Sequence, residues 1–88
     1  MNVSVFVQTL NEEENLPRCL DSLHWSDDIV VLDSLSADHT EEIVRGAGAR
    51  FYQRQYDGRA NNQNWAVENI VFKYPWVYYS DADEVVPP

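Results

Sequence analysis

The run YYSDADEVV, residues 78–86, places three carboxylates within four positions. They belong to Asp81, Asp83 and Glu84, and they directly follow residues 76–79, whose types are typical of a β-strand. Carboxylates this close repel one another unless a cation or hydrogen-bond donors compensate their charge. The spacing therefore indicates either a cation-binding turn or a solvated acidic turn at the surface.

Polar side chains also follow two earlier strand-like segments. They occur in the runs Gln8, Thr9, Leu10, Asn11, Glu12 and Asp33, Ser34, Leu35, Ser36, Ala37, Asp38. In an open α/β sheet, ligands bind at the carboxyl ends of the strands, so these hydroxyls, amides and carboxylates should gather at one edge. Oxygen ligands of this kind suit Mg²⁺ or Mn²⁺, and bound phosphates would complete the coordination shell.

The elements that must position these residues alternate along the chain. Val3, Val5 and Val7 recur at every second position, as in a strand, and residues 29–32 form the continuous apolar run of a strand buried on both faces. Strands are expected over residues 3–8, 29–32, 50–53 and 76–79, and helices from near Asn15, from near Asp38 and within residues 58–74. Pro75 should end the last helix, whose apolar side is expected to include Trp65, Ala66, Ile70 and Val71.

The resulting order, β-α-β-α-β-α-β, predicts an α/β fold. It is a partial Rossmann-like parallel sheet, in strand order 3-2-1-4, with helices on both faces. The 88 residues suffice for one small domain, and a 44% hydrophobic content indicates a folded core.

Charge and composition exclude several classes of function. A formal net charge of −9 disfavours nucleic acid, whose phosphates need Lys and Arg, but not a nucleotide held through a divalent cation. Cys19 is the only cysteine, so neither an internal disulfide nor a multi-cysteine metal site is expected. The sequence shows no signal peptide and no apolar run of about 18 residues that could span a bilayer, which predicts a cytoplasmic location.

Four segments together resemble the N-terminal half of a family-2 glycosyltransferase with the GT-A fold. They are VFVQTLNEEENLPRCLDSL (5–23), DDIVVLDSLSADHTEEI (27–43), GRANNQNWAVEN (58–69) and WVYYSDADE (76–84). The resemblance covers nearly the whole chain and is greatest to bacterial enzymes that glycosylate lipopolysaccharide core or other surface polysaccharides. It implies inverting transfer of a sugar from a nucleotide diphosphate donor to a hydroxyl of a saccharide or lipid-linked acceptor, assisted by Mg²⁺ or Mn²⁺.

The resemblance also implies roles for individual residues. The nucleotide-sugar-binding set is Thr9, Asn11, Glu12, Asp33, Ser36, Gln63 and Asp81, and the metal set is Asp81 and Asp83. Asp33 matches the carboxylate that accepts a hydrogen bond from uracil, which favours UDP, although guanine and thymine also present ring N–H donors. Asp81-Ala82-Asp83 matches the Asp-x-Asp motif, with Asp83 as direct metal ligand and Asp81 on the ribose or a metal-bound water.

Two features depart from the family pattern. Many members carry Arg-Asn where this chain has Gln63-Asn64, and Arg59 is the candidate that could supply the missing charge. Members also continue past the Asp-x-Asp motif into an acceptor-binding half with the catalytic base. We therefore expect residues 1–88 to be a donor-binding half, truncated before the acceptor half and inactive alone. The full-length enzyme would lie in the cytoplasm, at the inner face of the membrane. The open fourth strand should favour self-association.

Each signal has a simpler explanation. Asp33 is equally consistent with a turn residue, Asp38 with a helix cap, and the acids near Glu12 with a helix N-terminus. The aromatic residues Trp65, Trp76, Tyr78 and Tyr79 are expected in the core, as is Cys19, whereas His24 and His39 are expected on the surface. Two other functions remain open: a non-catalytic nucleotide- or cation-binding module, and a haloacid-dehalogenase-like phosphatase with Asp81 as nucleophile.

Overall fold

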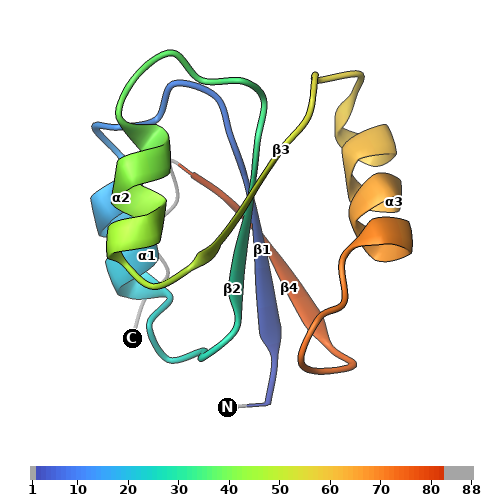
Figure 1. Ribbon diagram of the computed structural model, residues 1–88. Coiled ribbons are helices and arrows are strands. Elements are labelled where there is room, and N and C mark those ends of the chain that lie inside the picture. The colour runs from blue at the N-terminus through green and yellow to red at the C-terminus, as the bar shows by residue number, and fades with distance from the viewer. Residues whose placement is uncertain (1, 83–88) are drawn as a thin grey trace.

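The computed structural model describes residues 2–82 and contains the predicted order of elements (Figure 1). The strands are β1 (Ser4–Thr9), β2 (Ile29–Asp33), β3 (Arg50–Gln53) and β4 (Val77–Asp81). The helices are α1 (Leu16–Ser22), α2 (Thr40–Gly46) and α3 (Arg59–Asn69). All strand pairs are parallel and the order is β3-β2-β1-β4, as predicted. The carboxyl ends of all four strands therefore meet at one edge of the sheet, the upper edge in Figure 1.

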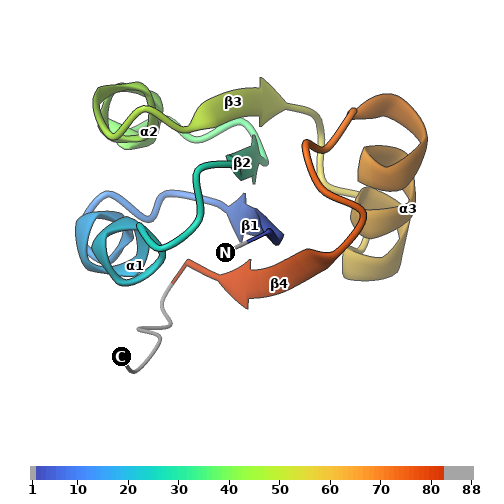
Figure 2. The same cartoon turned by 90° about the horizontal axis from the view of Figure 1, so that it is seen from below.

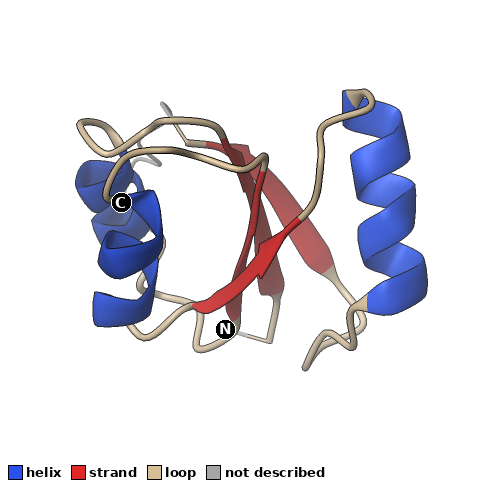
Figure 3. Ribbon diagram, turned by 45° about the horizontal axis from the view of Figure 1, so that its top comes forward, coloured by secondary structure: helices blue, strands red, loops and turns tan. Residues whose placement is uncertain are grey.

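The sheet lies between two helical layers, with α1 and α2 on one face and α3 on the other (Figures 2 and 3). Alternation along the strands divides the core accordingly. Val5 and Val7 pack with the buried residues of α1 and α2, whereas Phe6 and Leu32 pack with Ala66 of α3. This division also decides on which face of the sheet each polar residue at the strand ends lies.

Helix α3 is shorter than the sequence predicted. It ends at Asn69, and Ile70 is already extended, although its side chain is buried as expected. Val71, expected on the apolar side of the helix, is 85% exposed. The chain leaves the helix early because it must return to the amino ends of the strands, where the backbone N–H of Lys73 donates to Asp28.

Strand β4 begins after Trp76, and Asp81 is its last residue. Trp76 was expected in the core but is 73% exposed, because it precedes the strand and packs in neither hydrophobic core cluster. Tyr78 packs edge-on against Trp25 and Tyr79 against Phe6, and both remain partly exposed. The predictions for Cys19, which is buried, and for His24 and His39, which are exposed, are confirmed.

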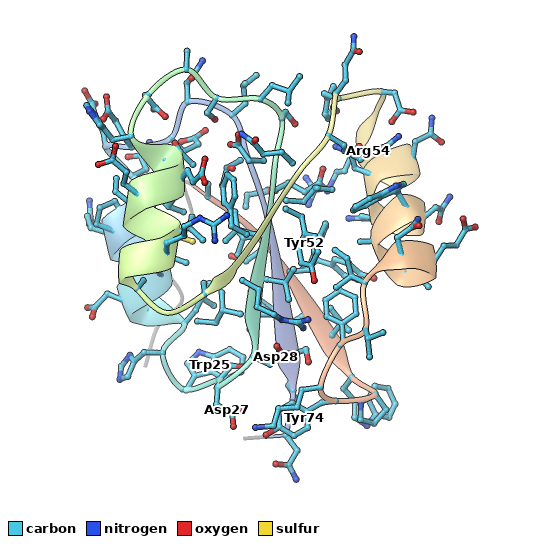
Figure 4. The ribbon with its side chains drawn as sticks, in the orientation of Figure 1. Trp25, Asp27, Asp28, Tyr52, Arg54 and Tyr74 are labelled. Atoms are coloured by element: carbon cyan, nitrogen blue, oxygen red, sulfur yellow. The ribbon has the colours of Figure 1, made fainter. Side chains whose placement is uncertain are left out.

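A buried carboxylate joins the amino ends of the strands. Asp28 accepts hydrogen bonds from the Ser4 hydroxyl at 2.5 Å, the Lys73 backbone N–H at 2.7 Å and the Arg50 guanidinium at 2.8 Å. Figure 4 shows Asp28 beside Asp27 and Tyr74 at this lower end. Burial alone would raise the pKa of Asp28, but the three donors outweigh it and lower the pKa below its ordinary value. Asp28 therefore fastens β1, β3 and the segment before β4 to the start of β2.

We predict that Asp28→Asn lowers the free energy of unfolding by about 1–3 kcal/mol, because an amide cannot accept from all three donors. Asp27→Asn is the matched control, since Asp27 lies at the surface and its ion pair with Lys73 is exposed to water, where such pairs contribute little to stability. Urea unfolding at neutral pH measures both variants. The role of Asp28 is contradicted if both variants unfold at the same urea concentration.

The same carboxylate makes stability depend on pH. Because its pKa is lower in the folded chain, Asp28 contributes stability that is full above the ordinary value of 3.8 and is lost as the pH falls below it. Unfolding of the wild-type chain and of Asp28→Asn should therefore converge in acid. A difference between them that stays constant from pH 7 to pH 2 would contradict this assignment.

Candidate functional site

The carboxylate of Asp33, the last residue of β2, is the centre of the carboxyl edge. It is fully buried, and its Oδ1 accepts from the hydroxyls of Thr9 at 2.6 Å and Ser36 at 2.5 Å. Its Oδ2 accepts from the Ser36 backbone N–H at 2.7 Å and from the Gln53 side-chain amide at 3.1 Å. Asp33 thus joins β1, β3 and the loop after β2 through four donors. A base N–H could reach this carboxylate only by displacing a donor, so direct recognition by Asp33 stays a prediction.

The loops after β1 and β2 are held together by hydrogen bonds; we call residues 10–15 and 34–40 the double loop. Asn11 donates its backbone N–H to the Ser36 hydroxyl at 2.7 Å and accepts the Ala37 N–H on its side chain at 2.9 Å. The backbone N–H groups of Glu12 and Glu13 donate to the side chains of Thr40 and Asp38. The predicted residues Thr9, Asn11, Glu12, Asp33 and Ser36 are therefore brought together in one connected structure.

The outer rim of the double loop carries charge. The Thr40 hydroxyl and backbone N–H donate to Asp38 and lower the pKa of its carboxyl group. His39 contacts the Glu13 carboxylate at 2.9 Å, and this hydrogen bond, with the nearby negative charge, raises the pKa of the imidazole. Helix α2 begins at Thr40 and its N-cap residue is His39, so Asp38 lies one residue before the cap position. Its carboxylate nevertheless accepts a hydrogen bond from the Thr40 backbone N–H.

Asp81, at the end of β4, is half exposed and forms an ion pair with Arg59 at 3.1 Å. Asp83 and Glu84 lie outside the described residues. Residues 2–82 contain no group of three or more His, Cys, Asp or Glu side chains arranged to hold a metal. Asp81 alone nevertheless fits Mg²⁺ or Mn²⁺, because such ions take one or two carboxylates and complete their shell with substrate phosphates. Arg59 supplies the positive charge at this carboxylate in the present arrangement.

A second polar chain, absent from the sequence prediction, connects β3, α3 and β1. The Arg54 guanidinium donates to Asn62 Oδ1 at 2.9 Å, and Asn62 Nδ2 donates to Gln8 Oε1 at 3.2 Å. Arg54 also lies over the Trp65 ring. Figure 4 shows Arg54 near the start of α3. Within residues 2–82 no hydrogen bond joins the predicted residue Gln63 to this network; its neighbour Asn62 makes that contact instead.

The residues that sequence reasoning missed differ in how readily they could have been found. Gln53 and Arg54 follow from the strand-end rule once it is applied to the third strand. Asn62 is fully buried and one helical turn before Ala66, so an amide in the apolar stripe of α3 was the available signal. No pattern in the sequence singled out Tyr56.

A small hollow, which we call the edge pocket, opens at the carboxyl edge. It has a volume of about 190 Å³, and its lining consists of Gln8, Thr9, Leu10, Ser34 and Tyr56. A larger hollow of about 580 Å³ lies between α1 and α2 and is lined by residues such as Leu20, His24 and Gly48. The larger hollow is remote from the strand ends where the polar network lies, so the edge pocket is the better candidate for a ligand.

Comparison with known sequences gives a consistent result. The model of the family described as Glycosyl transferase family 2 matches residues 4–88. The lipopolysaccharide core biosynthesis glycosyltransferase LpsC of Rhizobium meliloti is 36% identical over 87 residues, which cover 93% of this chain and 32% of LpsC. The 4,4'-diaponeurosporenoate glycosyltransferase of Staphylococcus haemolyticus is 38% identical over 63 residues, covering 68% of this chain and 17% of that protein. The chain thus spans about a third or less of these relatives.

Solved structures share the fold. The mannosyltransferase PcManGT from Pyrobaculum calidifontis, in complex with GDP-Man and Mn²⁺, superposes with a TM-score of 0.80 at 27% identity, over 99% of this chain and 29% of that one. TarS 1-349 of S. aureus, in complex with UDP-GlcNAc, gives 0.78 at 27% identity, over 94% and 27%. Among the described residues, no helix is both long and apolar enough to cross a membrane.

We predict that Asp33→Asn lowers the free energy of unfolding by about 1–3 kcal/mol for each buried donor that it leaves without an acceptor. The amide has a single acceptor oxygen to face the four donors that Asp33 now satisfies. Asp21→Asn, an exposed change on α1, is the control and should stay within about 0.5 kcal/mol of wild type. Equal urea midpoints for the two variants would show that the Asp33 network does not hold the edge together.

Proposed function

The chain belongs to glycosyl transferase family 2, and from that membership we propose that it binds a nucleotide diphosphate sugar along the carboxyl edge of its sheet. The observation that carries this proposal is the connected network around Asp33, which fixes the double loop at the edge where α/β sheets bind ligands. UDP-GlcNAc in the similar TarS structure and GDP-Man in PcManGT support the ligand class.

In this proposal the residues of the carboxyl edge contact different parts of the nucleotide sugar. Thr9, Asn11, Glu12 and Ser36 line the nucleotide pocket, and Asp33 accepts a base N–H or fixes the groups around it. Gln63 offers an amide where many family members offer a guanidinium. UDP is the proposed nucleotide, since uracil presents a ring N–H, with guanine and thymine nucleotides as alternatives.

We propose that a divalent cation, Mg²⁺ or Mn²⁺, joins the diphosphate to Asp81 and Asp83. When bound, such an ion neutralises the charge that develops on a diphosphate leaving group. The described carboxylate of Asp81 is partly exposed and already faces a positive charge on Arg59. In this proposal a bound cation replaces Arg59 as the partner of Asp81, and the Arg59 guanidinium then turns to the diphosphate. The Mn²⁺ present in the PcManGT structure and in glucosyl-3-phosphoglycerate synthase of Mycobacterium tuberculosis supports this class of cofactor.

For the whole enzyme we propose inverting transfer of the sugar to a hydroxyl of a saccharide or lipid-linked acceptor, in the synthesis of a surface polysaccharide. The similarity to LpsC supports the acceptor class. Family membership favours a transferase over the phosphatase alternative, whereas a nucleotide-binding module without catalysis remains the alternative for these 88 residues.

The metal role leads to a prediction for nucleotide binding. In calorimetric titrations of UDP with Mn²⁺, Asp83→Ala should abolish the Mn²⁺-dependent binding, and Asp81→Ala should weaken it about tenfold, or about 1.4 kcal/mol. Asp21→Ala, on α1, is the control that removes an acid elsewhere. Wild-type affinity in the Asp83→Ala variant would exclude the metal role of that residue.

A second prediction concerns catalysis. Three carboxylates of the carboxyl edge, Glu12, Asp33 and Asp81, are assigned to the nucleotide and the cation, which leaves none of them as the base that must remove the acceptor proton. Two others, Glu13 and Asp38, are held by His39 and Thr40. We therefore expect the 88 residues alone to transfer no sugar from UDP-sugars to hydroxyl acceptors in a product assay by mass spectrometry. Metal-dependent transfer by the purified chain would contradict the assignment.

The open side of β4 leads to a third prediction. Within residues 2–82 no strand pairs with the side of β4 opposite β1, so its outward N–H and C=O groups are available for pairing with another strand. We expect the chain to associate with itself at high concentration, as measured by sedimentation velocity. A sedimentation coefficient that stays at the monomer value up to the solubility limit of the chain would contradict this expectation.

A further inference from the structure

Helix α3 packs against the sheet through few buried side chains. Of its eleven residues, the buried ones are Asn62 and Ala66, and Trp65 is partly buried. The apolar contacts of Ala66 and Trp65 have no preferred direction, so they do not determine how the helix is rotated on the sheet. Hydrogen bonds are directional, and the buried amide of Asn62 therefore decides where the first turn of α3 points.

The Asn62 amide joins two strand ends, and its partners determine its orientation. Arg54 has hydrogen-bond donors only, so the Asn62 atom that it contacts at 2.9 Å must be the acceptor Oδ1. Nδ2 is thereby turned toward β1, where it donates to Gln8 Oε1 at 3.2 Å. Arg54 is itself held by an ion pair with Asp57 and by its contact with the Trp65 ring. Because Asn62 is fully buried, breaking either hydrogen bond would leave a polar group away from water.

Gln8 and Asp81 are neighbours in one row across the sheet. They are register partners on the parallel strands β1 and β4, so their side chains leave the same face. It is the face covered by α3, because Phe6 packs there with Ala66 and contacts the ring of Tyr79. The start of α3 lies at this same carboxyl edge, the upper edge in Figure 1.

The first turn of α3 contacts both members of this row. Arg59 and Asn62 are three residues apart and therefore lie on the same side of the helix. Asn62 donates to Gln8, and Arg59 forms its ion pair with Asp81 at 3.1 Å. The side chains of that ion pair are 56% and 44% exposed, and an exposed pair is too weak to hold a helix in place. The buried amide therefore positions the guanidinium, and not the reverse.

We propose that Asn62 is a positioning residue for the diphosphate: its amide anchors the first turn of α3 to Gln8, so that Arg59 faces Asp81. This inference rests on the proposed function, since it requires that a diphosphate and a cation bind beside Asp81. When the cation becomes the partner of Asp81, Asn62 keeps α3 in place, and the released guanidinium of Arg59 stays within reach of the diphosphate. Asn62 acts through Arg59 alone, because it is itself fully buried.

The positioning itself is tested without a ligand, by amide chemical shifts of the ¹⁵N-labelled chain. Arg59→Gln removes the ion pair and should change the amide shift of Asp81. In the Asn62→Leu background the same replacement should change that shift far less, because Arg59 no longer faces Asp81. Asn69→Leu, at the exposed far end of α3, is the matched control, and its background should behave as wild type does. An equal change at Asp81 in all three backgrounds would overturn the inference.

If Asn62→Leu alone does not fold, as judged by circular dichroism, the ligand-free comparison uses a chain that also carries Gln8→Met. This pair of substitutions replaces both partners of the hydrogen bond by apolar groups of similar size, so no donor or acceptor is left unpaired between them. Arg54 keeps its ion pair with Asp57 in this chain. The expected loss of the Arg59 effect at Asp81 is the same.

The consequence for the ligand is tested by titrating the chain with UDP and with uridine in Mn²⁺. Asn62→Leu should weaken UDP binding about tenfold, as Arg59→Gln does, and should leave uridine binding unchanged, because uridine has no diphosphate. The chain with both substitutions should bind UDP no more weakly than Arg59→Gln alone, since both remove the same contact. A residue with only a structural role would weaken both ligands, and its effect would add to that of Arg59→Gln.

The outcomes separate the inference from the proposed function. A folded wild-type chain that binds no UDP would overturn the proposed function, and the role of Asn62 toward a diphosphate with it. UDP binding that Arg59→Gln weakens and Asn62→Leu leaves unchanged would overturn the inference alone. The same holds if Asn62→Leu weakens uridine as much as UDP.

Discussion

The burial of a carboxylate at the end of β2 is the constraint on which the candidate site depends. A carboxylate withdrawn from water is tolerated only where hydrogen-bond donors replace its hydration, and Asp33 receives four of them. Each donor comes from a segment that must stay in place for the carboxylate to remain satisfied. The hydrogen bonds that satisfy Asp33 therefore also fix the end of β1, the end of β3 and the double loop.

A buried acid lies at each end of β2, Asp28 directly before the strand and Asp33 as its last residue. Asp28 gathers the amino ends of the strands and the segment before β4. The larger hollow between α1 and α2 reaches the neighbouring residues Ser26, Asp27 and Ile29. Asp33 gathers the carboxyl ends, where Gln8, Thr9 and Ser34 belong to the lining of the edge pocket. Each end of the sheet is thereby held together by the hydrogen bonds of one carboxylate. With a formal net charge of −9 on the chain, the proposed diphosphate would need a cation or Arg59 to bind at the carboxyl edge.

Much of the fold followed from local patterns in the sequence. Alternating and continuous apolar runs located β1 and β2, and the βα alternation predicted a parallel sheet. The end of α3 and the exposure of Trp76 could not be predicted, because both depend on how the chain returns to Asp28 rather than on local preference.

The candidate site was predictable in part for the same reason. The strand-end rule brought Thr9, Asn11 and Ser36 to Asp33, as the structure shows. The chain from Arg54 through Asn62 to Gln8 depends on how α3 is rotated against the sheet, which no pattern in the sequence fixes. The most direct test of the account is a titration of the ¹⁵N-labelled chain with UDP and Mg²⁺, followed by amide chemical shifts. The account predicts shifts confined to residues 8–12, 33–36, 54–62 and 81–83, with none near Asp28 and Lys73 at the amino edge. Shifts centred on the amino edge, or on the hollow between α1 and α2, would contradict it.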